Sequence, residues 1–181
     1  LSGVGLLGGS MLRDFAIVAT AYGANFQDLK SSGAEGVFSL FLGVILSFSL
    51  GALIAIFFGY TDAISITTIG AGAVTFVVGP ITGSAIGAGS EVIALSVAAG
   101  LVKSILVMTM TPLVARRIGL NNPKSAMVFG GLMGTNSGVA AGLAAVDPKL
   151  VPYGAMTATF YTALGCLIVP SVLFFIVNLF Y

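Results

Sequence analysis

Three charged residues interrupt apolar stretches of the sequence and could bind an ion or an anionic substrate. Arg13 and Asp14 break the apolar run 1–22, and Lys103 lies in the middle of the apolar run 92–115. A guanidinium can hold a carboxylate through two parallel hydrogen bonds, and ionisable residues inside hydrophobic spans often line a substrate or ion pathway. We therefore expect Arg13 and Lys103 to bind an anionic substrate, and Asp14 to offset the charge of Arg13 or to help hold a cation.

Each of these charges also has a structural interpretation. Arg13 and Asp14 could mark a helix end at the water interface, where both charges are solvated. Lys103 could form a structural ion pair with Asp14 or Asp62. Glu91 cannot reach it along the same helix, because twelve residues of helix span about 18 Å.

Uncharged polar groups concentrate in two glycine-rich segments, 70–89 and 129–142. Gly79-Pro80 in the first and Thr135-Asn136-Ser137 in the second predict broken or re-entrant helices, since proline removes a backbone donor. Freed backbone at membrane depth must be buried in protein or line a wet cavity. We expect substrate-binding groups from Thr82, Ser84, Asn136 and Ser137, and sodium ligands from Asp14, Gly79 and Thr135.

Two plainer interpretations of these segments remain open. Small residues allow helices to pack closely in a membrane, and Ser and Thr hydroxyls can bond back to their own helix.

Several kinds of chemistry are absent from the sequence. It contains no histidine, so no histidine-based catalytic pair, metal ligand or proton relay exists in these 181 residues. The single cysteine, Cys166, lies in an apolar stretch, where we expect a packing role. A serine hydrolase built on 134–138 would need Lys103 as its base, and no phosphate-binding loop occurs. We expect no enzyme, no catalytic residue and no cofactor.

The overall composition places the chain in a lipid bilayer. Charged residues make up 7% of the 181 residues, against about 25% in a soluble domain. Seven Lys and Arg against six Asp and Glu provide no basic stripe for nucleic acid. The composition thus predicts an all-α integral membrane protein.

Long intervals with no charge, or with Lys103 alone, divide this protein into helices. The ranges 37–58, 92–115 and 154–180 are rich in large apolar residues and predict lipid-spanning helices. The glycine-rich segments precede the second and third of them, and a shift of 58 residues places Gly72 on Gly130 and Pro112 on Pro170. We expect one membrane domain over 1–181, with repeat-like units 64–115 and 125–180.

The direction of the two units depends on the path of the broken segments. Arg116, Arg117 and Lys124 form the most basic loop, which predicts a cytoplasmic position. If each broken segment is a hairpin, the units are inverted and the C-terminus lies outside. If the segments cross fully, the units are parallel. We favour the inverted, hairpin arrangement because it matches alternating-access transporters.

Some polar residues are assigned to structure. Asn122-Pro123 and Asp147-Pro148 are helix-start signals, and Tyr153 and Tyr161 suit packing or interface positions.

The sequence as a whole resembles a known family. The stretches 13–20, 67–74, 120–135 and 147–162 are similar to the larger, MadM-type subunit of the bacterial two-component malonate transporter. This resemblance implies sodium-coupled malonate uptake through the inner (plasma) membrane, with sodium as the coupling ion and a smaller MadL-type membrane subunit as partner. Family members continue upstream, so we expect the protein to extend beyond Leu1.

Physical chemistry is consistent with this implication. Malonate carries two carboxylates, which are costly to move bare through hydrocarbon, and a cationic residue with a bound sodium ion would offset that charge. The alternative functions are a passive anion channel and an assembly subunit of a membrane complex.

Overall fold

The computed structural model describes residues 33–181, which are helical apart from short connections. The all-α membrane class is thereby confirmed. The elements are α4 (Gly33–Phe57), α5 (Ala63–Val74), α6 (Val78–Ile86), α7 (Ser90–Val114), α8 (Pro123–Met133), α9 (Asn136–Ala144), η2 (Pro148–Leu150), α10 (Val151–Ile168), the π-helical η3 (Val169–Leu173) and α11 (Phe174–Val177).

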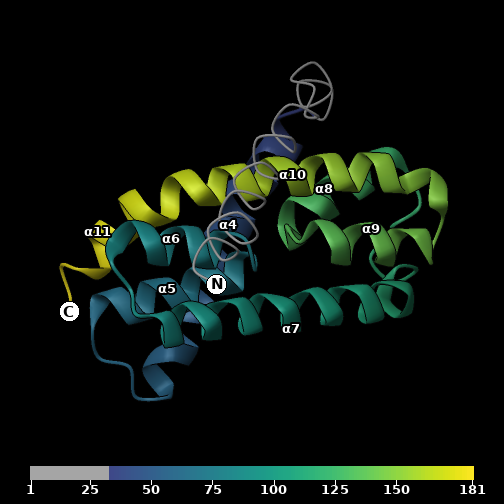
Figure 1. The fold of residues 1–181 in the computed structure, drawn as a ribbon. Helices are drawn as coiled ribbons and strands as arrows, with labels where there is room; N and C mark the ends of the chain where they lie inside the picture. The colour runs from purple at the N-terminus through teal and green to yellow at the C-terminus, as the bar shows by residue number, and fades with distance from the viewer. Residues whose placement is uncertain (1–32) are drawn as a thin grey trace, which may run out of the picture.

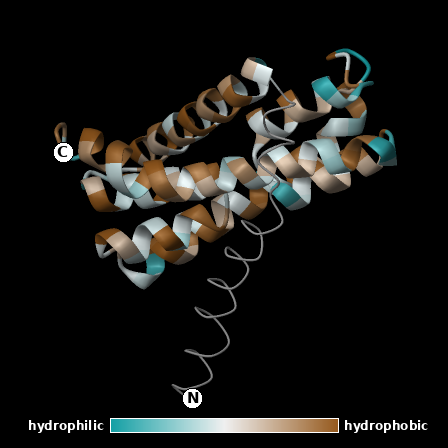
Figure 2. Cartoon of the chain, turned by 90° about the horizontal axis from the view of Figure 1, so that it is seen from above, coloured by the Kyte–Doolittle hydropathy of each residue, from teal (hydrophilic) through white to brown (hydrophobic). Residues whose placement is uncertain are grey.

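Within residues 33–181, three helical stretches are long and apolar enough to cross a membrane. They are Gly33–Phe57, Ser90–Val114 and Pro148–Val177, which confirms the three predicted spans. Hydrophobic residues cover these helices along their length (Figure 2). Large side chains such as Phe38, Leu53 and Leu101 are exposed on them, as expected for surfaces that face lipid.

The first glycine-rich segment folds as α5 and α6, and its break lies earlier than predicted. Helix α5 ends at Val74, and α6 begins at Val78. Thr75 is extended, with φ −154°, and its Oγ1 accepts hydrogen bonds from the backbone N–H groups of Val77 (3.2 Å) and Val78 (3.0 Å). Pro80 lies in the first turn of α6, where its missing N–H costs nothing. The prediction that Gly79-Pro80 forms the break was therefore wrong.

The second glycine-rich segment folds as α8 and α9. Gly134 ends α8 in the left-handed region, with φ 69°, and its N–H donates to the carbonyl of Gly130. A Cβ at Gly134 would also collide with the ring of Tyr161, so both its conformation and its close contact require glycine. The chain leaves helix at Gly134 and Thr135, so the break overlaps the predicted Thr135-Asn136-Ser137 at Thr135, while Asn136 and Ser137 begin α9.

The arms of the first pair lie beside α7. The tip residue Phe76 packs on Gly100, Gly79 packs on Ser96, and Gly83 packs on Ile93. As residue numbers rise along α6 they fall along α7, so α6 runs antiparallel to α7 and returns toward its N-terminal end.

The arms of the second pair lie beside α10 and α7. Gly130 packs on Gly154 and Gly134 on Tyr161, so α8 runs alongside α10 in the same direction. Gly138 packs on Ser104 and Gly142 on Thr111, so α9 runs back toward the C-terminal end of α7. In Figure 1, α7 and α10 run in opposite directions, with α5 and α6 near one end and α8 and α9 near the other.

Helix starts follow the predicted caps. Asn122 accepts from the N–H of Ser125 at 2.9 Å in a capping box, and Pro123 begins α8. Asp147 accepts from the N–H of Lys149 at 3.0 Å at the start of η2. Asp62, which the sequence analysis considered as a partner for Lys103, instead caps α5 through the N–H of Ser65 at 2.8 Å.

Candidate functional site

The two helix breaks meet at the middle of α7. Lys103 bonds to the end of α5, and the adjacent Ser104 contacts Thr135 between α8 and α9. From α10, Tyr161 reaches both places, because its hydroxyl bonds to Lys103 and its ring lies against Gly134. The broken ends of both pairs therefore lie beside adjacent residues of one long helix.

The Lys103 ammonium is surrounded by neutral oxygen atoms. Its Nζ donates to Ser47 Oγ at 2.9 Å, to the carbonyl of Val74 at 2.9 Å and to Tyr161 Oη at 3.2 Å. It also lies 5.1 Å from the centre of the Tyr161 ring. An ammonium has three hydrogens to donate, and these three acceptors use them all. Among residues 33–181 the ion pair is Lys124–Glu35, so the acidic partner predicted for Lys103 is not found there.

Tyr161 connects this cluster to α4. It is fully buried, and its hydroxyl donates to the carbonyl of Gly43 at 3.2 Å while accepting from Lys103. Its assignment to a packing or interface position was too narrow, because it links three helices around the half-buried Lys103 charge. The only signal in the sequence was the 58-residue shift, which places Lys103 on Tyr161.

An open groove that contains three polar side chains in a mostly apolar lining, called the polar groove below, lies beside the start of α9. Its volume is about 570 Å³, and its lining comes from α9 and α10: Asn136, Ser137, Ala140, Pro152, Ala155, Met156 and Thr159. The Asn136 amide donates to Thr159 Oγ1 at 3.1 Å across it. Thr159 was not predicted as a site residue, since nothing in the sequence distinguishes it from other helical threonines.

The two returning helices, α6 and α9, begin differently. Thr75 Oγ1 accepts from the first amides of α6, whereas Thr135, the N-cap of α9, makes no side-chain cap bond. Its hydroxyl contacts Ser104 instead. The positive end of the α9 dipole is therefore left without a side-chain cap, next to the polar groove.

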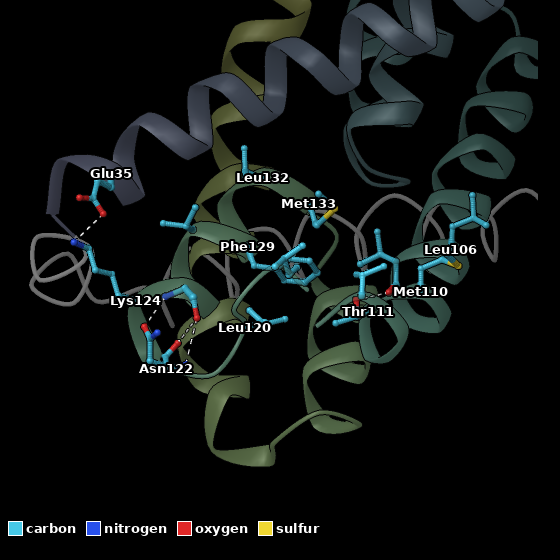
Figure 3. Close-up of a pocket in the computed structure, with 15 residues that line it drawn as sticks. Glu35, Leu106, Met110, Thr111, Leu120, Asn122, Lys124, Phe129, Leu132 and Met133 are labelled. Carbon is cyan, nitrogen blue, oxygen red and sulfur yellow. Dashed lines mark hydrogen bonds and ion pairs between the residues drawn. The ribbon is translucent and has the colours of Figure 1, made fainter. Parts of the chain in front are cut away.

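A second cavity, of about 780 Å³, is lined mostly by apolar side chains of α7 and α8. Leu106, Met110 and Phe129 line it, and the Lys124–Glu35 ion pair lies at its edge (Figure 3). Burying carboxylates against such a wall is costly, so this cavity is a poor site for a dicarboxylate.

The remaining predicted site residues lie apart from one another. Thr82 is buried, and its hydroxyl has no hydrogen-bond partner within the described part of the chain. Ser84 is exposed in the last turn of α6, and Gly79 packs against Ser96. Arg13 and Asp14 lie outside the described residues.

Comparison with known proteins identifies the family. The sequence matches the MadM family, described as the malonate/sodium symporter MadM subunit, over residues 1–181. No curated protein and no solved structure matches the chain. Because the match covers every residue, the chain belongs to the MadM family of malonate/sodium symporter subunits.

Proposed function

We propose that this protein drives malonate uptake across the bacterial inner membrane with sodium, in complex with a smaller MadL-type subunit. The observation that carries the proposal is the meeting of two broken helix pairs beside a half-buried lysine at the middle of a long apolar helix. Interrupted helices that converge at midplane typically form the binding sites of secondary transporters.

The proposed orientation rests on the positive charges. Arg116, Arg117, Lys124 and Lys149 belong to connections or helix starts at the end where α7 finishes and α10 begins. The starts of α5 and α7, at the opposite end, carry the acidic Asp62 and Glu91 instead. An excess of Lys and Arg marks the cytoplasmic side, so α8 and α9 form a hairpin entered from the cytoplasm, and the C-terminus lies outside.

Malonate binds, in this proposal, at the polar groove where α9 begins. The α9 amides, the Asn136 amide and the Ser137 and Thr159 hydroxyls supply donors for a carboxylate. The groove follows α10 from Thr159 toward Pro152, which leads from the middle of the span toward its proposed cytoplasmic end. Thr82 and Ser84 remain proposed contributors from the first pair.

Positive charge near the midplane lowers the cost of admitting a dianion. Lys103 supplies such a charge even though its three donors are bonded to protein oxygens. Arg13 remains the proposed residue for direct two-point contact with a carboxylate, with Asp14 beside it.

Sodium binds, in this proposal, at the tip of the second pair. Thr135 and Ser104 bring two hydroxyl oxygens together there, at the negative end of the α8 dipole. Gly79, also proposed from the sequence, would contribute only through its backbone carbonyl.

A binding experiment tests the shared site. If sodium and malonate bind together, each must raise the affinity for the other by the same factor. Isothermal titration of the purified two-subunit complex with malonate, in sodium and then in choline buffer, should give tighter binding in sodium. Equal affinity in both buffers contradicts the proposal and favours a passive channel.

A further inference from the structure

Lys103 occupies a position that has the chemistry of a monovalent-cation site. Its ammonium lies among one carbonyl oxygen and two hydroxyl oxygens, from Val74, Ser47 and Tyr161, at 2.9–3.2 Å. Neutral oxygens of these kinds, gathered where a helix is interrupted, are the ligands that sodium finds in transporters.

The backbone at this position favours positive charge. The carbonyl of Val74 is the last one of α5, and the chain turns away at Thr75. Carbonyls at a helix C-terminus carry partial negative charge, which stabilises a nearby cation. The Tyr161 ring, 5.1 Å from Nζ, adds the attraction of its negative face.

The ammonium has no acidic counter-charge within residues 33–181. The ion pair there joins Lys124 to Glu35, and Asp62 caps the other end of α5. Lys103 is therefore held as a bound cation would be, by neutral oxygens, rather than as half of an ion pair.

Within residues 33–181, the second helix pair has no equivalent tethered cation. A shift of 58 residues places Lys103 on Tyr161. In the second unit, the position that corresponds to Lys103 is therefore occupied by a neutral phenol, which lies against Gly134 at the end of α8. Two hydroxyls, of Ser104 and Thr135, meet beside that end instead.

We propose that the Lys103 ammonium is a covalently attached substitute for a coupling cation at the end of α5. A free sodium ion then binds only at the break between α8 and α9. The protein therefore uses one sodium ion fewer per transport cycle than it would if each of its two helix breaks held one. This inference rests on the proposed function, because it concerns the number of coupling ions of the symporter.

Three substitutions separate the effect of the Lys103 charge from that of the space its side chain fills. Lys103→Ala removes the ammonium and opens room for an ion among the three oxygens. Lys103→Met also removes the charge but keeps a chain of similar length, which fills the room with apolar atoms. Lys103→Ser is a second space-opening variant.

The measurement is stability of the purified two-subunit complex against sodium concentration, without malonate. Above the dissociation constant, each bound ion multiplies the folded-to-unfolded ratio by about ten for every tenfold rise in sodium. For each tenfold rise in sodium, we expect the folded-to-unfolded ratio of Lys103→Ala and Lys103→Ser to rise about ten times more than that of wild type. The ratio of Lys103→Met should rise only as much as that of wild type. Choline chloride in place of sodium chloride controls for ionic strength.

The outcomes are distinct. A sodium dependence in both space-opening variants that equals that of wild type overturns the inference, and so does failure of both to assemble at any sodium concentration. A wild-type complex that binds malonate equally in sodium and choline contradicts the proposed function instead, and leaves the stability comparison to be judged separately.

Discussion

At the scale of single residues, the start of α9 carries the polar groups best placed to hold a carboxylate. We predict that Asn136→Asp lowers malonate transport about tenfold or more, which corresponds to roughly 1.4 kcal/mol of lost binding. Aspartate keeps an oxygen that can accept from Thr159, and its negative charge suits a helix N-terminus, so stability should be retained. Labelled malonate uptake and thermal unfolding measure the two effects.

The matched control for this substitution is Asn121→Asp, which makes the same chemical change on an exposed connection. It should transport at the wild-type rate. Equal loss in both variants would show that the effect comes from net charge, and not from the groove.

A second residue-scale prediction concerns the buried hydroxyl of Thr82. A buried hydroxyl without a partner costs about 1–3 kcal/mol, and the described residues offer Thr82 none. Thr82→Val should therefore leave stability unchanged or raise it, yet lower malonate uptake, because the hydroxyl is a proposed ligand group. Uptake at the wild-type rate by a well-expressed variant would remove Thr82 from the site.

At the scale of elements, the second helix pair depends on Gly134. We predict that Gly134→Ala destabilises the protein more than Gly119→Ala does. Both glycines have positive φ, 69° and 67°, which costs an L-residue roughly 1–2 kcal/mol. Only at Gly134 does the new methyl meet the Tyr161 ring, which adds about 1–3 kcal/mol of overpacking.

Thermal unfolding of the detergent-solubilised complex provides the comparison. Equal shifts of the unfolding temperature would mean that Tyr161 moves aside, and that the tip of the second pair is less tightly packed than its contacts indicate.

Among the helices and their connections, some features could be predicted from the sequence and others could not. Apolar length predicted the three spans, and Asn122-Pro123 and Asp147-Pro148 predicted the starts of α8 and η2, because caps act within one turn. The first break was misplaced because the Thr75 hydroxyl caps α6 locally, which leaves Pro80 in a harmless first-turn position.

The partners of Lys103 could not be predicted from local sequence. Ser47, Val74 and Tyr161 come from three other helices and are 56, 29 and 58 residues away along the chain. Such contacts depend on how helices pack. Of the two acidic partners considered, Asp62 caps α5 instead and Asp14 lies outside the described residues, while neutral oxygens satisfy the half-buried ammonium within residues 33–181.

At the scale of the whole molecule, the return path of each broken pair fixes which connections share a side of the membrane. We predict that cysteines introduced at Thr61 and Ala88 in a Cys166→Ser background react with a membrane-impermeant thiol reagent from outside. Cysteines at Ile118 and Val146 should react only from the cytoplasm. This pattern follows because each broken pair returns to the end from which it started.

Labelling of intact cells and of inverted vesicles distinguishes the two arrangements. If positions 61 and 88 react from opposite sides, α5 and α6 together cross the membrane, and the inverted arrangement of the two units is wrong.

The most direct test of the central claim is labelled malonate uptake into proteoliposomes that contain both subunits. With sodium outside and choline inside, malonate should accumulate above its external concentration, saturate with rising malonate, and decline when a sodium ionophore dissipates the gradient. Uptake that merely equilibrates, does not saturate and is the same with and without the sodium gradient would contradict the account and identify a passive pathway.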